Sequence, residues 1–257
     1  MIRLDCHSHV KGGFWDYGGL TATSLVEAAD KLGIDALCCS VPMNKPATTP
    51  EEFRACNDDM LRAMKEYPDK IWGYCFVNPG YQSESLVEIE KRITEDGMVG
   101  VKLYNQYKCS DPVVQPIVRK TIELKVPILQ HAGYLTDPIE AAKQPNISDA
   151  HDIVQLANLF PEAMIVEAHL PGGGDWQWAL KTIRKAKNVF VDTSGSIVDC
   201  GFVERAVEYV GAERILFGTD LSMEEGVGKI LDAEITQEEK KLIFGENLSR
   251  ILRRRPK

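Results

Sequence analysis

Residues 1–9, MIRLDCHSH, end a short apolar run with two histidines. Residues 2–4 begin a predicted strand that ends at His7 and His9. Side chains two positions apart on a strand point to the same side, so both imidazoles project together at its carboxyl end. Two adjacent imidazoles make half of a metal site, and the remaining ligands have to come from elsewhere in the chain.

The rest of the sequence alternates between apolar, β-branched runs and helix-like stretches. We predict eight strands, at residues 2–9, 34–41, 71–77, 99–104, 126–131, 164–169, 189–192 and 215–220. We predict helices between and after them, at residues 24–32, 51–67, 84–96, 112–124, 149–159, 176–186, 201–210 and 237–252, the last broken near Gly245. This alternation predicts an α/β fold, a (β/α)8 TIM barrel formed as a single domain over residues 1–257. The alternative is a doubly wound open sheet, which usually carries a glycine-rich phosphate loop that is missing after the first strand here.

Composition narrows the class of protein. The 257 residues are 44% hydrophobic and 26% charged, as in ordinary globular domains, and the net charge is −8. An acidic chain argues against a nucleic-acid partner or an anionic membrane surface. The odd count of seven cysteines, without a CxxC pair, fits a reducing cytoplasm. No signal-peptide-like start or membrane-spanning apolar stretch is present, so we expect a cytoplasmic enzyme of small molecules.

Four of the five histidines fall at the carboxyl ends of predicted strands. His7 and His9 end the first strand, His131 the fifth and His169 the sixth, and Asp220 ends the eighth. In a parallel barrel all strands open their carboxyl ends on one rim, where active sites lie. We therefore predict that these five side chains converge on a metal ion. His151 falls near a helix start, and we interpret it as structural or exposed.

Several motifs resemble the amidohydrolase superfamily. They are the HxH at 7–9, VKLY at 101–104, QHAG at 130–133, EAHLPGG at 167–173, FGTD at 217–220 and GENLSRIL at 245–252. The resemblance is strongest to the amidohydrolase-related branch that includes aminocarboxymuconate semialdehyde decarboxylase. Each motif is weak alone, but the ordered set runs the length of the chain.

The resemblance implies roles for individual residues. His7, His9, His131 and Asp220 match the family's metal ligands. His169 matches the histidine that holds the water in single-metal members and binds a second ion in two-metal members. The implied cofactor is Zn²⁺ or another divalent ion, most simply one per chain. His169 and Asp220 are the implied catalytic residues.

Lys102 occupies the position of the fourth strand at which two-metal relatives carry a bridging lysine carbamate. Similar lysines in single-metal relatives are not modified. The other roles open to Lys102 are a cation for a substrate carboxylate and a structural ion pair. We predict Lys102 and Tyr104 as substrate-binding residues.

The ligand set suits water activation, because a bound water with a pKa near 7 provides hydroxide at neutral pH. We predict a metal-dependent hydrolase of a small amide, lactone or ester. The alternative is a metal-dependent non-oxidative decarboxylase of an aromatic or enoic acid, since the branch contains both. A phosphoesterase like the deoxyribonucleases that share the HxH is less similar, because those place an acidic ligand where Lys102 stands. A barrel with a structural or lost metal is the non-enzyme alternative.

Polar and aromatic residues in the loops after the strands are expected at the mouth of the barrel, where they would suit a carboxylated or cyclic substrate. They are Lys11, Phe14, Trp15, Tyr17, Asn44, Lys45, Tyr104, Asn105, Gln106 and Trp176. Aromatic loop residues also often pack locally. Three glycines at 172–174 predict a tight turn beside the site. A homodimer is possible, as in many relatives.

Overall fold

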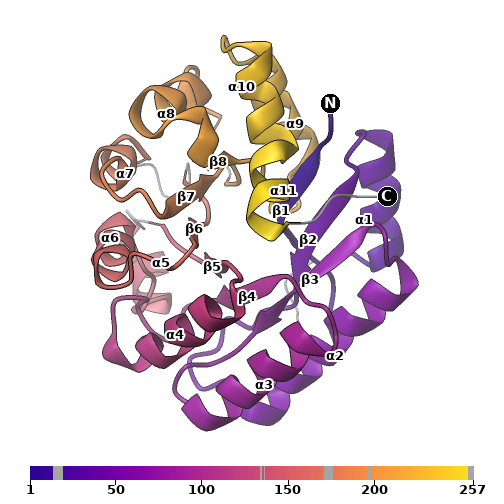
Figure 1. Cartoon of the computed structure of the whole chain (residues 1–257), viewed down its shortest axis with the longest axis vertical. Coiled ribbons are helices and arrows are strands. Elements are labelled where there is room, and N and C mark those ends of the chain that lie inside the picture. The colour runs from indigo at the N-terminus through magenta and orange to yellow at the C-terminus, as the bar shows by residue number, and fades with distance from the viewer. Residues whose placement is uncertain (14–19, 134, 136, 171–175, 196–197, 254–257) are drawn as a thin grey trace.

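The computed structural model describes residues 1–13, 20–133, 135, 137–170, 176–195 and 198–253. Eight parallel strands follow one another around a barrel in chain order (Figure 1). They are β1 (Leu4–His9), β2 (Ala36–Ser40), β3 (Ile71–Phe76), β4 (Gly100–Leu103), β5 (Ile128–Gln130), β6 (Ile165–Glu167), β7 (Val189–Asp192) and β8 (Ile215–Leu216). Cys6 on β1 donates a backbone hydrogen bond of 2.8 Å to the carbonyl of Phe217, which brings the last strand back to the first. The predicted single-domain (β/α)8 barrel is confirmed, and the open sheet is excluded.

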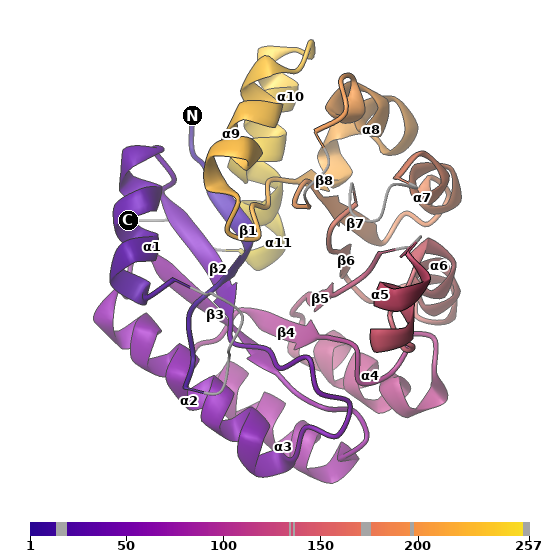
Figure 2. The same cartoon turned by 180° about the vertical axis from the view of Figure 1, so that it is seen from behind.

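Helices surround the strands on all sides (Figure 2). They are α1 (Ala22–Lys31), α2 (Pro50–Glu66), α3 (Gln82–Thr94), α4 (Gln115–Leu124), α5 (Pro138–Lys143), α6 (Ala150–Leu159), α7 (Trp176–Ile183), α8 (Phe202–Val210), α9 (Met223–Asp232), α10 (Gln237–Lys241) and α11 (Asn247–Leu252). A 3₁₀ turn, Pro112–Val114, precedes α4. Among the helices described, none has the length and apolar character that a membrane span requires.

Local sequence explains where several of these helices begin. At α2 the Thr49 hydroxyl accepts the Glu52 N–H, and the Glu52 side chain accepts the Thr49 N–H at 2.8 Å. Pro50 takes the first helical position, where its missing N–H is not needed. Asp149 and Asp152 form the same reciprocal cap at α6. These caps fix the ends of helices that follow strands β2 and β5.

The chain end departs from a single regular helix, as the sequence indicates. Between α10 and α11 the backbone widens into a π-helical segment, Leu242–Glu246. A Cβ on Gly245 would lie 2.8 Å from Cγ2 and 2.9 Å from the carbonyl oxygen of Ile2. Gly245 therefore allows the last helices to lie directly against the start of β1. The chain stays helical at the predicted break, where the irregularity takes the form of this π-helical segment.

Two apolar layers hold the barrel together. Outward-facing strand residues such as Leu37 and Ile165 pack under the helices, and inward-facing ones such as Leu4 and Leu129 fill the interior. The alternation follows from the two-residue period of a strand. All seven cysteines are free thiols, and all except Cys200 are buried. A buried free thiol packs as a small apolar side chain.

Candidate metal centre

His7, His9 and Asp220 come together at the rim of the barrel. Among the described residues they form a group that could hold a metal ion, with one donor atom from each lying within 4.8 Å of the others. Asp220 Oδ1 is 3.0 Å from His9 Nε2 and 3.8 Å from His7 Nε2. Residues at opposite ends of the sequence thus meet where β8 returns to β1, as the rim argument predicts.

The hydrogen bonds of the two imidazoles orient their lone pairs toward Asp220. His7 Nδ1 lies 2.8 Å from Asp192 Oδ2, a carboxylate that can only accept, so Nδ1 carries the proton. His9 Nδ1 lies 3.1 Å from the Ser40 hydroxyl and 3.3 Å from the Ser40 carbonyl oxygen, and a proton on Nδ1 satisfies the carbonyl, which can only accept. Both Nε2 atoms then present lone pairs toward the Asp220 carboxylate. A divalent cation between them satisfies all three donors, so the residues fit a metal ion.

The electrostatics keep these ligands in the form that binds metal. Burial lowers the pKa of His7 to about 3, and the nearby Lys102 ammonium acts in the same direction, so the imidazole is neutral at pH 7. Burial acts to raise the pKa of Asp220, but the surrounding histidines hold it well below its usual value. A neutral imidazole and an ionised carboxylate are the protonation states a metal requires.

His169 and Asp220 adopt strained backbone conformations. His169 has φ +60° and Asp220 has φ +46°, followed by Leu221 at φ +74°. The left-handed region is costly for residues with a Cβ and persists only where the surroundings enforce it. The His169 N–H donates to Asp192 Oδ1 at 2.9 Å, and the Asp220 N–H donates to the His7 carbonyl at 2.8 Å. These bonds hold both side chains at the rim.

His131 lies beside this group but pairs with His169. His131 Nδ1 is 3.1 Å from His169 Nε2, and its ring stacks on Tyr104 with centroids 4.1 Å apart. His169 Nδ1 is in turn 3.6 Å from Asp220 Oδ2. Burial lowers the pKa of both imidazoles below the usual histidine value. The structure brings all five predicted side chains to one site, with His131 and His169 outside the three-residue donor group.

Lys102 points into the same site from β4. Its Nζ lies 2.9 Å from His7 Nε2 and 5.7 Å from the centre of the Tyr104 ring, and the side chain is fully buried. Burial lowers the pKa of Lys102 to about 8. The predicted substrate-binding pair, Lys102 and Tyr104, therefore lies against the candidate metal ligands.

The sequence profile of one family, described as amidohydrolase, matches residues 4–254. The chain belongs to the amidohydrolase family. Membership makes it an enzyme, a hydrolase or a carboxy-lyase, and confirms the resemblance found in the motifs. A search of curated proteins finds no match for the chain.

Several of the solved structures similar to this chain are decarboxylases. A 2,6-dihydroxybenzoate decarboxylase bound to 2,6-dihydroxybenzoate is 14% identical, with 98% of each chain covered and a TM-score of 0.78. The 5-carboxyvanillate decarboxylase of Novosphingobium aromaticivorans, bound to manganese and a nitrobenzoic acid, is 17% identical over 98% of this chain and 96% of its own, with a TM-score of 0.77. The 4-oxalomesaconate hydratase of Rhodopseudomonas palustris is 17% identical over the same shares, with a TM-score of 0.74. At these identities the likeness shows the fold.

Three site residues of this family member were missed by the sequence reasoning. Asp192 is the last residue of β7 and Ser194 lies just after it, and both contact His7 and His169. Asp192 ends the predicted strand 189–192, so the strand-end rule that found Asp220 could have found it. Asp5 is the third: it accepts from the His7 N–H at 2.9 Å and from the Thr219 hydroxyl at 2.6 Å. Burial raises the pKa of Asp5 to about 8.

The loop residues expected at the mouth of the barrel differ in where they lie. Phe14, Trp15, Tyr17 and the glycines at 172–174 lie outside the described residues. Asn105 and Gln106 are buried and bind neighbouring loops, through Gln144 at 2.5 Å and the Met43 carbonyl at 2.9 Å. Trp176 binds Asp199 at 2.7 Å. These three side chains therefore join rim segments to one another.

In the loop after β2, the Lys45 side chain pairs with Glu52. The His151 side chain is 83% exposed, in line with the interpretation that it is not a ligand. The fifth histidine thus stays apart from the four that meet at the site.

Proposed function

We propose that the protein is a metal-dependent, non-oxidative decarboxylase of a small aromatic or enoic carboxylic acid. One observation carries the proposal: the buried Lys102 ammonium lies 2.9 Å from His7 Nε2, directly beside the candidate metal ligands. A substrate carboxylate and a neighbouring oxygen would meet two positive centres in one desolvated site, where charge interactions are strong. The decarboxylases among the similar solved structures support the same choice over the hydrolase that the sequence favoured.

We propose His7, His9 and Asp220 as ligands of one divalent ion, with His131 approaching as a fourth. Imidazole and carboxylate donors suit Zn²⁺ or Mn²⁺, and manganese is the ion of the carboxyvanillate enzyme. When bound, the ion would supply positive charge that stabilises negative charge on an adjacent substrate oxygen. His7 and His9 contribute no proton to this process, because their Nδ1 hydrogens are held by Asp192 and Ser40.

Lys102 and Tyr104 are the proposed substrate-binding residues. Lys102 would neutralise a carboxylate, and burial makes such a charge pair stronger than at the surface. Tyr104 is stacked on His131, which fixes the plane of its ring beside the site. A planar acid can lie against such an aromatic surface.

Decarboxylation needs a proton at the carbon that loses CO₂. The C–C bond breaks, its electron pair stays on the substrate carbon, CO₂ leaves, and one proton takes its place. Asp220 Oδ2 and His169 Nδ1 are 3.6 Å apart at the proposed reaction site. The proton comes from solvent water. We propose that Asp220, which is ionised at rest, accepts it on Oδ2 only transiently and delivers it to the substrate carbon while His169 orients the reacting group.

Hydrolysis of a lactone, amide or ester is the second candidate. The 3.6 Å separation between His169 Nδ1 and Asp220 Oδ2 favours it, since both groups can contact one water molecule. Asp220 would then accept a proton from water and pass it to the leaving group, with His169 orienting the bond under attack. The same residues serve either reaction, so the substrate decides between them.

A product screen tests the proposal. Metal-loaded protein is incubated with hydroxybenzoate-type acids, lactones and amides, while CO₂ release and acid production are followed separately. We expect the wild type to release CO₂ from one of the acids. The Asp220→Asn variant should lose this activity, and Asp232→Asn, which changes an exposed carboxylate, should keep it. Acid produced from a lactone or amide without CO₂ would select hydrolysis and reject decarboxylation.

A further inference from the structure

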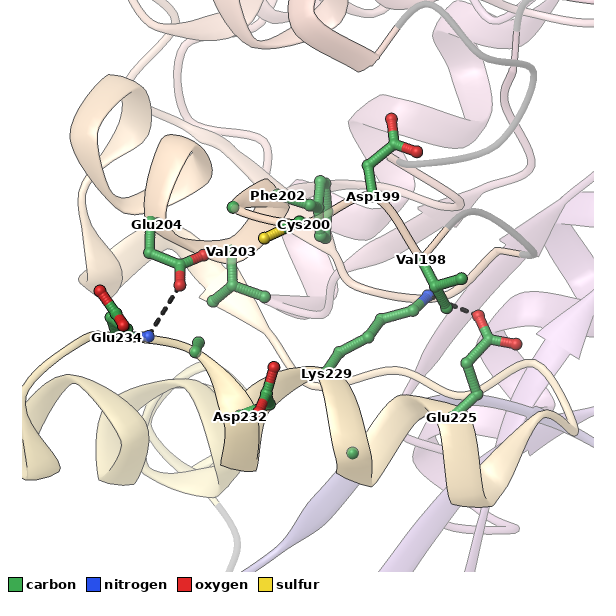
Figure 3. Close-up of a pocket in the computed structure, with 13 residues that line it drawn as sticks. Val198, Asp199, Cys200, Phe202, Val203, Glu204, Glu225, Lys229, Asp232 and Glu234 are labelled. Atoms are coloured by element: carbon green, nitrogen blue, oxygen red, sulfur yellow. Dashed lines mark hydrogen bonds and ion pairs between the residues drawn. The ribbon is translucent and has the colours of Figure 1, made fainter.

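Lys229 on α9 is buried away from the candidate metal ligands and has no part in the chemistry described so far. Its side chain is 7% exposed. Its Nζ donates to the Gly195 carbonyl at 2.8 Å and the Thr193 carbonyl at 3.3 Å, and pairs with Glu225 Oε1 at 2.9 Å. Figure 3 shows Lys229 and Glu225 joined in this way. Lys229 therefore donates hydrogen bonds to two backbone carbonyls, and Glu225 contributes an ion pair rather than a third hydrogen bond.

The two carbonyls that Lys229 binds flank Ser194. The Ser194 hydroxyl donates to Asp192 Oδ1 at 2.7 Å, and its Oγ lies 3.0 Å from His169 Nδ1. A hydroxyl has one proton, and the carboxylate takes it. Ser194 Oγ must therefore accept a hydrogen bond from His169, which fixes the proton of that imidazole on Nδ1. His169 Nε2 is left as the acceptor facing His131 Nδ1, at 3.1 Å.

We propose that Lys229 is a positioning residue: by holding the carbonyls of Thr193 and Gly195 it fixes Ser194, and through Ser194 the tautomer and orientation of His169. The effect of Lys229 on turnover rests on the proposed function. The assignment of the His169 tautomer is independent of that function, because it follows from the hydrogen bonds alone.

The packing of α9 supports this role. A Cβ on Gly226 would lie 3.0 Å from Thr219 Cγ2 and 3.4 Å from the Gly218 carbonyl, so the helix backbone packs directly on the residues that precede Asp220. Lys229 leaves the same helix toward the loop after β7. Thus α9 connects the segment that carries Asp220 to the segment that carries Ser194.

A cavity of about 700 Å³ lies beside the Lys229 stem (Figure 3). Glu225 and Lys229 line one side of it, and the start of α8 with Cys200 lines the other. None of the candidate metal ligands borders this cavity. The space means that a change of side chain at 229 creates no overpacking, so substitutions there should fold.

Nitrogen NMR of metal-free protein labelled at histidine tests the inference directly. Wild type should show His169 with its proton on Nδ1. Lys229→Met, which keeps the length but loses the donors, should show a mixture of the two tautomers, as should Ser194→Ala. Lys229→Arg, which keeps donors, should retain the wild-type tautomer. A folded Lys229→Met with the wild-type tautomer would overturn the inference.

Lys240→Met is the matched control. Lys240 is also buried and donates to a backbone carbonyl of α9, that of Leu231 at 2.6 Å, two residues beyond Lys229. Loosening α9 in this way should leave the His169 tautomer unchanged. A shift as large as that of Lys229→Met would assign the effect to general loosening of the helix and overturn the inference. If Lys229→Met fails to fold, Lys229→Gln takes its place.

A double-mutant cycle on turnover separates this inference from the proposed function. With an identified substrate, Lys229→Met and Ser194→Ala should each lower kcat about tenfold, the loss expected from one misplaced hydrogen bond, with KM little changed. The double variant should lose no more than Ser194→Ala alone. Additive losses would show that Lys229 acts elsewhere. If wild type decarboxylates none of the acids, the proposed function fails while the NMR test still decides the role of Lys229.

Discussion

His7 Nδ1 lies 2.8 Å from Asp192 Oδ2, and both side chains are fully buried. Burial would by itself raise the pKa of Asp192, but its contacts with His7 lower it to about 2. An ionised carboxylate behind an imidazole fixes the ring and increases the basicity of its other nitrogen. That nitrogen, His7 Nε2, faces Asp220.

Asp192→Asn should weaken binding of Zn²⁺ or Mn²⁺ by about 10–100-fold, the usual cost of losing a carboxylate behind a histidine ligand. The amide also replaces an acceptor that holds the N–H groups of His169 and Ser194. Competition with a chromophoric chelator measures the affinity. Asp232→Asn, at an exposed position, is the control and should bind as wild type. Equal affinities in the two variants would contradict the role of Asp192.

His9→Asn and His169→Asn should separate metal binding from catalysis. The first removes a ligand, so both the ion and turnover should be lost. The second should retain the ion and lower kcat by about 10²–10⁴, the contribution typical of a proton-transfer or orienting group. Elemental analysis alongside the kinetics distinguishes the two. Loss of the ion in His169→Asn would make that residue a ligand and refute its assigned role.

Metal stoichiometry decides the state of Lys102. We expect one ion per chain and an unmodified lysine, so Lys102→Met should keep the ion and raise KM for the acid. Lys45→Met, at an exposed pair with Glu52, should change neither. Two ions per chain, with a carbamate carbon visible after labelling with ¹³CO₂, would reverse the assignment and make Lys102 a bridging ligand.

The Asp152 carboxylate should make stability depend on pH at a position far from the metal ligands. Burial acts to raise its pKa, but hydrogen bonds from Lys108 at 2.8 Å and Ser110 at 2.7 Å hold it below the usual 3.8. A carboxylate whose pKa is lower in the folded than in the unfolded state stabilises the protein at pH values above its unfolded-state pKa. This stabilisation is lost as the pH falls through the folded-state pKa. Asp152→Asn should therefore cost about 1 kcal/mol at pH 7.

That difference should shrink progressively below about pH 4, where the wild-type carboxylate begins to be protonated. Denaturant titrations of both proteins at a series of pH values measure it. Asp232→Asn should follow wild type throughout. A gap that stays constant down to pH 2 would show that charge at Asp152 contributes nothing.

The barrel could be predicted because each strand is an apolar run, and successive runs are separated by stretches with the residue spacing of a helix. Helix α9 escaped prediction because residues 223–232 contain two glycines, which lower helix propensity, and its stability comes from packing on residues 218–219. Helix α5 is six residues long, too short for a periodic signal. Strand β8 ends at Leu216, earlier than the predicted residue 220, and the Gly218 N–H donates to the Thr193 hydroxyl instead of to a backbone carbonyl. Asp220 and Leu221 then follow with positive φ.

The convergence of the candidate metal ligands could be predicted because strand ends meet at one rim, a consequence of topology alone. Ser194 and Lys229 could not, since their roles arise from a backbone path that only the folded chain defines. The left-handed conformation of His169 was equally inaccessible. Nothing in the spacing of a histidine reports that its N–H will be held by a carboxylate 23 residues later.

The choice between hydrolysis and decarboxylation could not be made from the residues. Both reactions need a cation beside a substrate oxygen and a group that transfers a proton. His169 and Asp220 could serve in either reaction with the same atoms. The difference lies in the bond that the substrate presents. Lys102, buried beside His7, is the feature of this site that favours an acid.

Anomalous diffraction from crystals loaded with Mn²⁺ or Zn²⁺ tests the convergence of His7, His9 and Asp220 most directly. The account predicts one strong peak within about 2.0–2.2 Å of both Nε2 atoms and of the Asp220 carboxylate. A peak elsewhere, or none at this rim in protein that is otherwise folded, would contradict it.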